Sequence, residues 1–167
     1  MNEDLSLLAG YPENVINQVK DLIKYNKLKL YLQSRYPDLH EIKTNTALFS
    51  YIQDIKKTYM KKSSPIHKVT YDDKIETVYN ALGLHSFVSR IQGRNLKSSN
   101  EIRIASLFKN APEDLLRMIV VHELAHLKEK DHNKNFYRLC HHMESDYAQL
   151  EFDVRLYLIS LRIHSER

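Results

Sequence analysis

The sequence predicts an α+β fold, with helices before and after a small, mostly antiparallel sheet. Apolar residues recur at helical spacing in the first third of the chain, then alternate with polar residues, and return to helical spacing in the last third. The segments concerned are 12–34 and 44–61, then 84–92 and 101–105, then 112 onward. Helices, short strands and helices in this order are typical of an α+β domain.

The length and composition are those of one domain. At 167 residues with 43% hydrophobic residues, the chain can form one packed core, and two full domains would be small. The clearest break is Ser63-Ser64-Pro65. We therefore expect a single domain, 1–167, in which 1–64 is a helical N-terminal part and 65–167 is the core that carries the functional residues.

Two helices are expected in the N-terminal part. The first runs over 12–34, beginning at Pro12, which suits a first turn, and ending before Pro37. The second runs over 44–61, with an apolar stripe on one side and a basic face, expected in solvent, on the other. The stripe consists of Leu48, Tyr51, Ile52, Ile55 and Tyr59, and the basic face of Lys56, Lys57, Lys61 and Lys62.

The middle of the chain is expected to be mixed. Val69-Thr70-Tyr71 favours a short strand, and residues 75–83 favour a helix that ends at Gly83. Alternation of apolar and polar residues predicts strands over 84–92 and 101–105. We expect these two strands to pair antiparallel through the polar connection between them.

Three helices are expected after residue 110. The first runs over 112–129 and begins with a capping Asn110, Pro112 in the first turn and two acids at the positive end of the helix dipole. Two further helices are expected over 133–144 and 146–163.

The first of these helices carries a pattern typical of metal hydrolases. A helix turns about 100° per residue, so the imidazoles of His122 and His126 lie on one face and can reach one ion. Glu123 lies beside that face, where it can act as general base on a water activated by the metal. His132 supplies a third ligand and leaves a fourth position open, as in catalytic zinc sites. The apolar run Leu115–Val121 buries the helix, where unpartnered polar groups would be costly.

The third ligand has an alternative. The spacing from His122 to His132 equals that of the metzincin motif, but Glu129 stands where that motif has glycine, and no convincing Met-turn follows. An acidic third ligand from a later helix is the other arrangement. The candidates for it are Glu144, Glu151 and Asp153.

Charge and cysteine content exclude few functions. A net charge of +4 and a pI near 9.0 permit contact with nucleic acid or other anions without predicting it. Cys140 is the only cysteine, so no intrachain disulfide is expected. The acidic start Met1–Asp4 is unlike a signal peptide, and no stretch reaches ~18 apolar residues, so we expect a cytoplasmic protein without a membrane partner.

The stretch 89–136 closely resembles the YgjP-like family of predicted metal-dependent hydrolases, and the similarity extends over nearly the whole chain. The resemblance rests on Val88–Gly93, Glu101–Ile104, Ala111-Pro112, Val120–Leu127 and Asp131–Phe136. The core is also similar to that of the SprT and WLM group of zinc peptidases. The resemblance implies a zincin-like fold in which Glu123 is the catalytic base and Zn²⁺ is bound by His122, His126 and His132.

Three functions remain open at this level. The first is a zinc-dependent metallopeptidase, whose peptide or protein substrate could pair with the strand around 102–106. The second is a metal-dependent hydrolase of a nucleotide or another small phosphate-containing anion. The Lys and Arg excess suits such a substrate, although the chain lacks a phosphate-cradling glycine loop. The third is a non-catalytic binding module, associated with nucleic acid, whose structural metal would need a fourth ligand such as Cys140.

Overall fold

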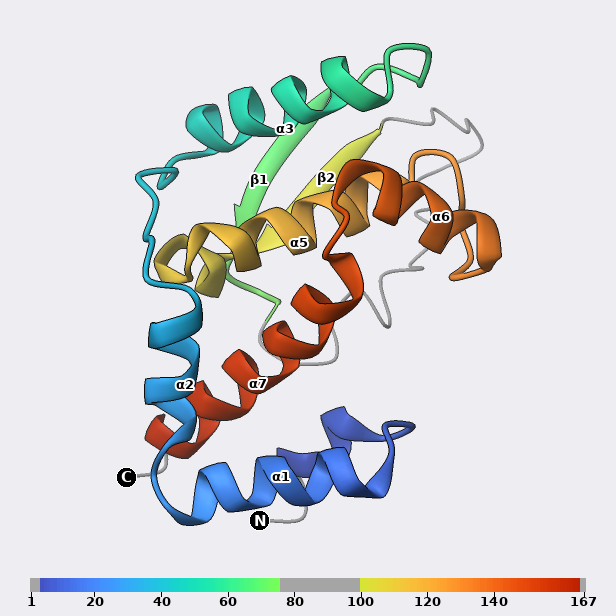
Figure 1. The fold of residues 1–167 in the computed structure, drawn as a ribbon. Coiled ribbons are helices and arrows are strands. Elements are labelled where there is room, and N and C mark those ends of the chain that lie inside the picture. Colours follow the sequence, from blue (N-terminus) through green and yellow to red (C-terminus); the bar gives the residue numbers. More distant parts are fainter. Residues whose placement is uncertain (1–3, 76–99, 166–167) are drawn as a thin grey trace.

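The computed structural model describes residues 4–75 and 100–165, and it confirms an α+β fold (Figure 1). Helices dominate, and the described strands form one small sheet. The α-helices are α1 (Glu13–Lys24), α2 (Leu28–Arg35), α3 (Asn45–Tyr59), α5 (Glu113–Ala125), α6 (Lys134–Met143) and α7 (Tyr147–Ser165). The 3₁₀-helices are η1 (Asp4–Leu8) and η2 (Ser106–Asn110), and the strands are β1 (Lys68–Asp72) and β2 (Glu101–Ala105).

The described sheet is parallel, which corrects the antiparallel expectation. β1 pairs with β2 in the same direction, from Lys68 opposite Glu101 to Asp72 opposite Ala105. Parallel neighbours need a long crossover connection, and the segment between Asp72 and Glu101 is long enough to supply one. The strand expected over 84–92 lies outside the described residues, as does all but the first residue of the helix expected over 75–83.

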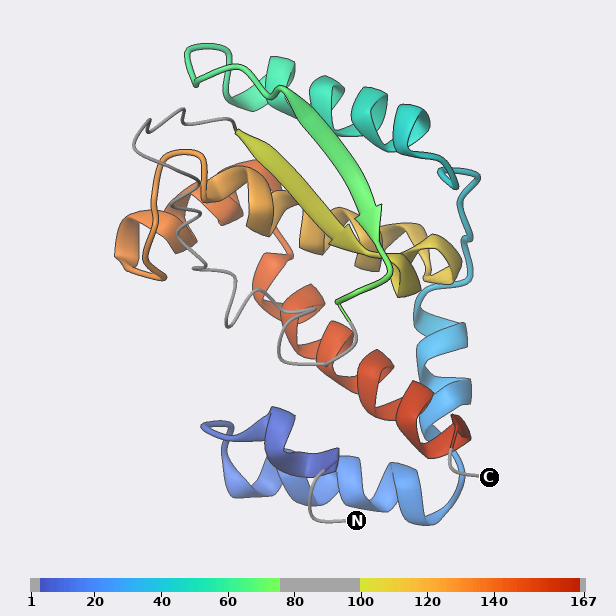
Figure 2. The same cartoon turned by 180° about the vertical axis from the view of Figure 1, so that it is seen from behind.

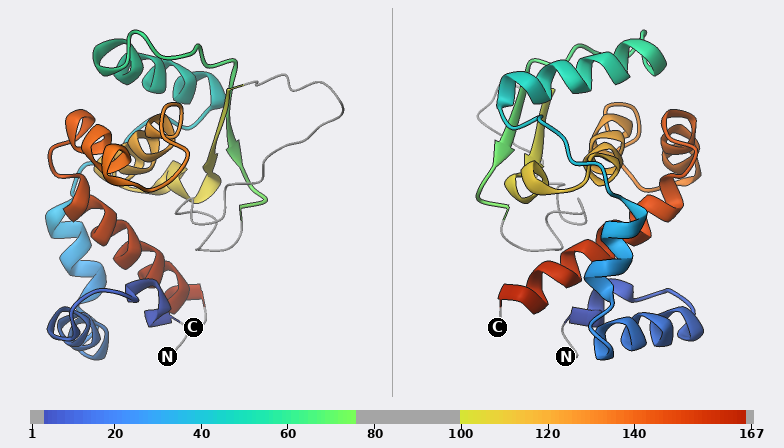
Figure 3. Two further views of the ribbon diagram at one scale, coloured as in Figure 1. Left: turned by 90° about the vertical axis from the view of Figure 1, so that its right-hand side faces the viewer. Right: turned by 60° about the vertical axis from the view of Figure 1, so that its left-hand side comes forward.

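Helices α3 and α5 lie on the same face of this sheet, α3 beside β1 and α5 beside β2 (Figure 3). The strands turn alternate side chains toward these helices, so Val69, Tyr71, Ile102 and Ile104 are buried. Seen from behind, β1 and β2 run side by side across α5 (Figure 2). The sheet therefore supports the helix that carries the His–Glu pattern.

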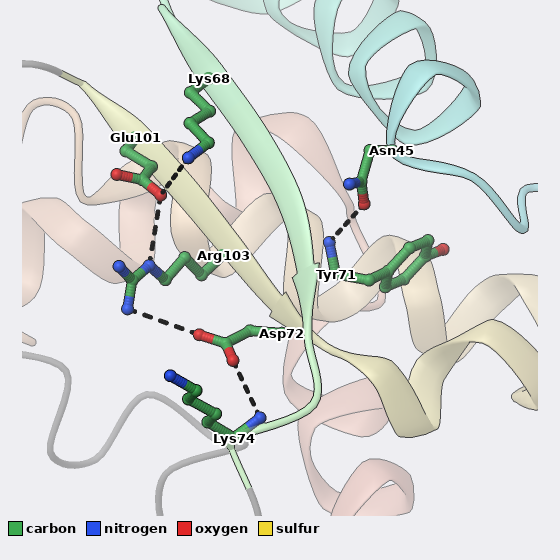
Figure 4. Close-up of polar contacts among 7 residues, drawn as sticks. All are labelled: Asn45, Lys68, Tyr71, Asp72, Lys74, Glu101 and Arg103. Carbon is green, nitrogen blue, oxygen red and sulfur yellow. Dashed lines mark hydrogen bonds and ion pairs between the residues drawn. The ribbon is translucent and has the colours of Figure 1, made fainter.

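The other face of the sheet is charged. Arg103 pairs with Glu101 at 3.3 Å and with Asp72 at 3.4 Å, and Lys68 lies 3.9 Å from Glu101 (Figure 4). At the edge nearer α3, the side chain of Asn45 accepts a 2.8 Å hydrogen bond from the backbone N–H of Tyr71. Ion pairs at an exposed surface contribute little free energy, so burial of the opposite face is what holds the sheet to the helices.

The first expected helix is two helices. α1 ends at Lys24 and α2 begins at Leu28, because Asn26 between them adopts a left-handed backbone with φ 55°. Asparagine tolerates that conformation better than most residues do, and a single left-handed residue ends an α-helix.

The second expected helix is confirmed as α3. Its start is capped by Thr44, whose hydroxyl accepts a 3.1 Å hydrogen bond from the N–H of Ala47. Its basic face is less uniform than expected. Lys56 is buried, with its Nζ 3.3 Å from the carbonyl of Ser63, whereas Lys57 and its neighbours Lys61 and Lys62 are exposed.

The later helices are confirmed with shifted ends. α5 begins at Glu113 with Pro112 in the capping position, and Asn110 instead closes η2, so the expected cap was wrong. α5 stops at Ala125, short of the predicted 129. α7 packs against α5, α2 and η1, and so joins the N-terminal helices to the core. Within the described residues, no helix is long and apolar enough to cross a membrane.

Candidate metal centre

Helix α5 carries His122 in a buried position and ends at the half-buried His126, its C-cap. Its apolar residues pack against β2 and α7, and nine of its thirteen residues are buried, His122 among them. Because His122 and His126 are one turn apart, their rings meet edge to face with centroids 4.8 Å apart. Burial of polar rings in such a place requires partners for their nitrogen atoms.

His132 reaches the same point from the turn after α5. Its Nε2 lies 3.1 Å from Nε2 of His126, which in turn lies 3.1 Å from Nε2 of His122. All three donor nitrogens lie within 4.8 Å of one another. In the part of the chain that the structure describes, this is the one group of three or more His, Cys, Asp or Glu residues that could hold a metal ion.

The turn explains why glycine is not needed at position 129. Among the described non-glycine residues only Asn26 has a positive φ, so Glu129 has an ordinary backbone conformation. The carbonyl of Glu129 lies 2.9 Å from Nδ1 of His126. Its carboxylate accepts a 3.2 Å hydrogen bond from the side chain of Asn133, whose own oxygen caps the start of α6. The turn thus holds both the second and the third imidazole.

Phe136 forms an apolar wall against all three imidazoles. It is fully buried, and its ring centroid lies 5.0 Å from that of His122 and 4.7 Å from those of His126 and His132. From the sequence, Phe136 is named only within the stretch Asp131–Phe136 that carries the family resemblance, without a role in the centre. The contacts of Phe136 with the three imidazoles depend on how α6 packs against α5, and residue spacing within one helix does not predict them.

The imidazoles are neutral, as metal binding requires. Burial, followed by the neighbouring imidazoles, lowers the pKa of His122 to about 2. Burial is also the main cause that lowers the pKa of His126 and of His132. A neutral imidazole keeps one nitrogen lone pair for a cation. Three converging neutral donors fit a divalent ion such as Zn²⁺.

The carboxyl group of Glu123 has a raised pKa. Glu123 follows His122 on α5 and is partly buried. Burial raises the pKa of its carboxyl to about 7, so the group can exchange a proton near neutral pH.

The acidic alternatives to His132 are all engaged elsewhere. Glu144 pairs with Arg117 at 2.7 Å, Glu151 with Arg155 at 2.8 Å, and the fully buried Asp153 with Arg35 at 3.1 Å. None of them belongs to the group of converging donors. Neither does Cys140, the fourth ligand that a closed structural site would need.

The fold and this centre define a metal-dependent hydrolase: a buried HExxH helix, a third imidazole and a carboxylate of raised pKa. The sequence model of a family described as "YgjP-like, metallopeptidase domain" matches residues 12–154. The chain belongs to the YgjP-like family. It is 55% identical over 160 residues, 96% of each chain, to a protein of Escherichia coli (strain K12) named "UTP pyrophosphatase". No solved structure matches the chain.

Proposed function

We propose that this protein hydrolyses a phosphoanhydride bond of a nucleoside triphosphate at a divalent cation, Zn²⁺ by its ligand set, held by His122, His126 and His132. The observation that carries the proposal is the Escherichia coli relative named for UTP, which is 55% identical over 96% of both chains. Of the functions that the sequence leaves open, this favours the small phosphate-containing anion over the peptide.

The residues of the centre suit this reaction. A divalent cation there would act as a Lewis acid on an oxygen of the reacting phosphate. Glu123 takes the proton of the attacking water as the new bond to the α-phosphorus forms. The α–β phosphoanhydride bond then breaks, and the departing pyrophosphate takes up the proton from Glu123. His122, His126 and His132 keep their neutral form throughout, because burial disfavours protonation of each ring.

Arg155 supplies a positive charge beside the centre. Its Nη2 pairs with Glu151 and its guanidinium lies 5.9 Å from the ring of Tyr11, while its buried Nε has no hydrogen-bond partner among the described residues. Burial is the main cause of the lowered pKa of His122 and of His132, and the charge of Arg155 contributes to it. The positive charge therefore acts on the imidazoles of the centre. A buried N–H without an acceptor is costly, and a phosphate oxygen is a strong acceptor for a guanidinium.

Peptide hydrolysis is the second candidate, because the matching family model describes a metallopeptidase domain. The same cation and Glu123 could direct water at an amide carbonyl. In that case an extended peptide would pair with an edge of the sheet, as in β-strand addition.

The test compares substrates on one preparation. Purified protein is loaded with Zn²⁺ or Mn²⁺ and incubated with UTP, the other nucleoside triphosphates and a mixed peptide library. We expect release of nucleoside monophosphate and pyrophosphate, detected by ion-exchange chromatography, and no cleaved peptides. Peptide cleavage without nucleotide turnover would reject the proposal in favour of the second candidate.

A matched pair of variants tests the charge. Arg155→Met should raise KM for the triphosphate roughly 10- to 100-fold, since a hydrogen bond to a charged group contributes ~1.5–3 kcal/mol. Lys57→Met removes the same charge from the exposed face of α3 and should leave KM unchanged. Equal effects of the two variants would show that only the overall charge matters.

A further inference from the structure

The Nδ1 atoms of His122 and His126 contact different kinds of group. Nδ1 of His126 faces the backbone carbonyl of Glu129 at 2.9 Å. A carbonyl can only accept, so Nδ1 of His126 must carry the hydrogen, and Nε2 keeps its lone pair. Nδ1 of His122 faces the hydroxyl of Tyr147, also at 2.9 Å. A hydroxyl can donate or accept, so this contact alone does not select a tautomer of His122.

The direction of that hydrogen bond decides whether His122 can bind a cation. If Tyr147 donates to Nδ1, the ring hydrogen sits on Nε2, which then has no lone pair for the metal. If Nδ1–H donates to Tyr147, Nε2 is free, but the hydroxyl hydrogen of Tyr147 needs an acceptor of its own. Tyr147 is fully buried, so bulk water does not provide one.

The thiol of Cys140 is positioned to be that acceptor. Cys140 lies on α6 and is fully buried; burial raises the pKa of its thiol, and the neighbouring hydroxyl of Tyr147 lowers that pKa in part. Sulfur is a weak acceptor, but among the described groups its competitor for this hydrogen is Nδ1 of His122. The other groups around the Tyr147 ring, Tyr137 and His141, make ring contacts at centroid distances of 6.4 Å and 5.8 Å.

We propose that Tyr147 and Cys140 are positioning residues that set the tautomer of His122. The hydrogen bonds run in one direction, from Nδ1–H of His122 to Oη of Tyr147, and from Oη–H to Sγ of Cys140. Every member of this relay is neutral, which suits its buried position. The inference rests on the proposed metal-binding role of His122 and is independent of the substrate.

The relay gives Cys140 a role at the centre although it is not one of the converging donors. Replacing its sulfur by an apolar group of similar size leaves the hydroxyl of Tyr147 with one remaining acceptor, Nδ1 of His122. The hydroxyl then turns, the ring hydrogen moves to Nε2, and metal affinity falls although no ligand has been altered. Loss of a group that orients a metal-binding imidazole typically weakens metal affinity ~10–100-fold.

The experiment measures tautomer and metal affinity separately. The ¹⁵N shifts of the His122 ring are recorded in the metal-free protein, with assignment from a His122→Gln variant, and zinc affinity is measured by competition with a chromophoric chelator. We expect Cys140→Val to shift the ring toward the Nε2–H tautomer and to weaken zinc binding ~10-fold or more. Cys140→Ser, which retains an acceptor, should resemble the wild type.

Two tyrosine variants complete the test. Tyr147→Phe should weaken zinc binding ~10–100-fold, because Nδ1–H loses its acceptor. Tyr137→Phe, a matched change on a partly exposed ring beside His132, should not. The inference would be overturned if Cys140→Val kept the His122 tautomer and bound zinc within twofold of the wild type. This outcome decides the matter even if Tyr147→Phe fails to fold. Absence of zinc binding in the wild type would instead reject the proposed function, and the ring tautomers of the metal-free protein would still decide the relay.

Discussion

A substitution of Asp153 on α7 tests whether this acid stabilises the fold or binds the metal. Its carboxylate is fully buried and joins α7 to α2. It pairs with Arg35 at 3.1 Å and accepts hydrogen bonds from Tyr36, from Tyr31 at 3.3 Å and from Gln149 at 3.0 Å. Asp153 is also one of the acids that the sequence offers in place of His132 as a metal ligand. The substitution Asp153→Asn therefore separates a structural role from a metal-binding role.

The expected cost follows from these contacts. Asparagine keeps the shape but offers one acceptor oxygen in place of two and carries no charge. Each hydrogen bond to a charged group contributes ~1.5–3 kcal/mol, and Arg35 is 45% exposed, so water replaces part of its contact with the carboxylate. We expect the free energy of unfolding to fall by about 3 kcal/mol. For a chain of this size that lowers Tm by roughly 6–12 °C.

The assay pairs calorimetry with zinc titration. Asp153→Asn should unfold at lower temperature and bind zinc as the wild type does below its own Tm. Asp54→Asn, the same change at an exposed position of α3, should shift stability by no more than about 0.5 kcal/mol. Loss of zinc at an unchanged Tm would refute the structural reasoning and would make Asp153 a ligand.

Three further predictions concern the centre itself. Glu123→Gln should retain the metal by elemental analysis and lose about 10²–10⁴-fold in kcat, whereas full activity would exclude Glu123 as the base. His132→Ala should emerge from gel filtration without stoichiometric zinc, and retention of one tightly held ion would pass the third-ligand role to Glu144, Glu151 or Asp153. Cys140 should resist iodoacetamide at pH ~8 in the native protein, because burial raises the pKa of its thiol to about 12 and only the thiolate reacts. In guanidinium the thiol should be alkylated rapidly. Rapid labelling of the folded protein would contradict the burial of Cys140.

Local chemistry in the sequence determined where most elements lie. The apolar stripe of α3 and the alternation at Ile102 and Ile104 follow from side-chain period alone, and both segments formed as predicted. The errors came from single residues with particular backbone or capping behaviour. Asn26 divides the first helix by adopting a positive φ, and Pro112 takes the capping position that Asn110 was expected to hold.

Strand direction could not be derived in the same way. The residues of β1 and β2 read identically whether the strands run parallel or antiparallel, because alternation reports which face is buried and not which neighbour is paired. Parallel pairing requires a crossover connection between the two strands, and side-chain alternation within each strand carries no information about that connection.

The same division holds for the metal centre. The i, i+4 spacing of His122 and His126 is enough to put two rings on one helix face, because helix geometry is local. The convergence of His132 depends on the turn around Glu129. The wall formed by Phe136 and the hydroxyl of Tyr147 behind His122 come from later helices, α6 and α7, which only tertiary packing brings to α5. Sequence by itself thus determined which groups can act as donors, whereas the fold decided which of them meet and which nitrogen each presents, since those depend on contacts between residues far apart in the chain.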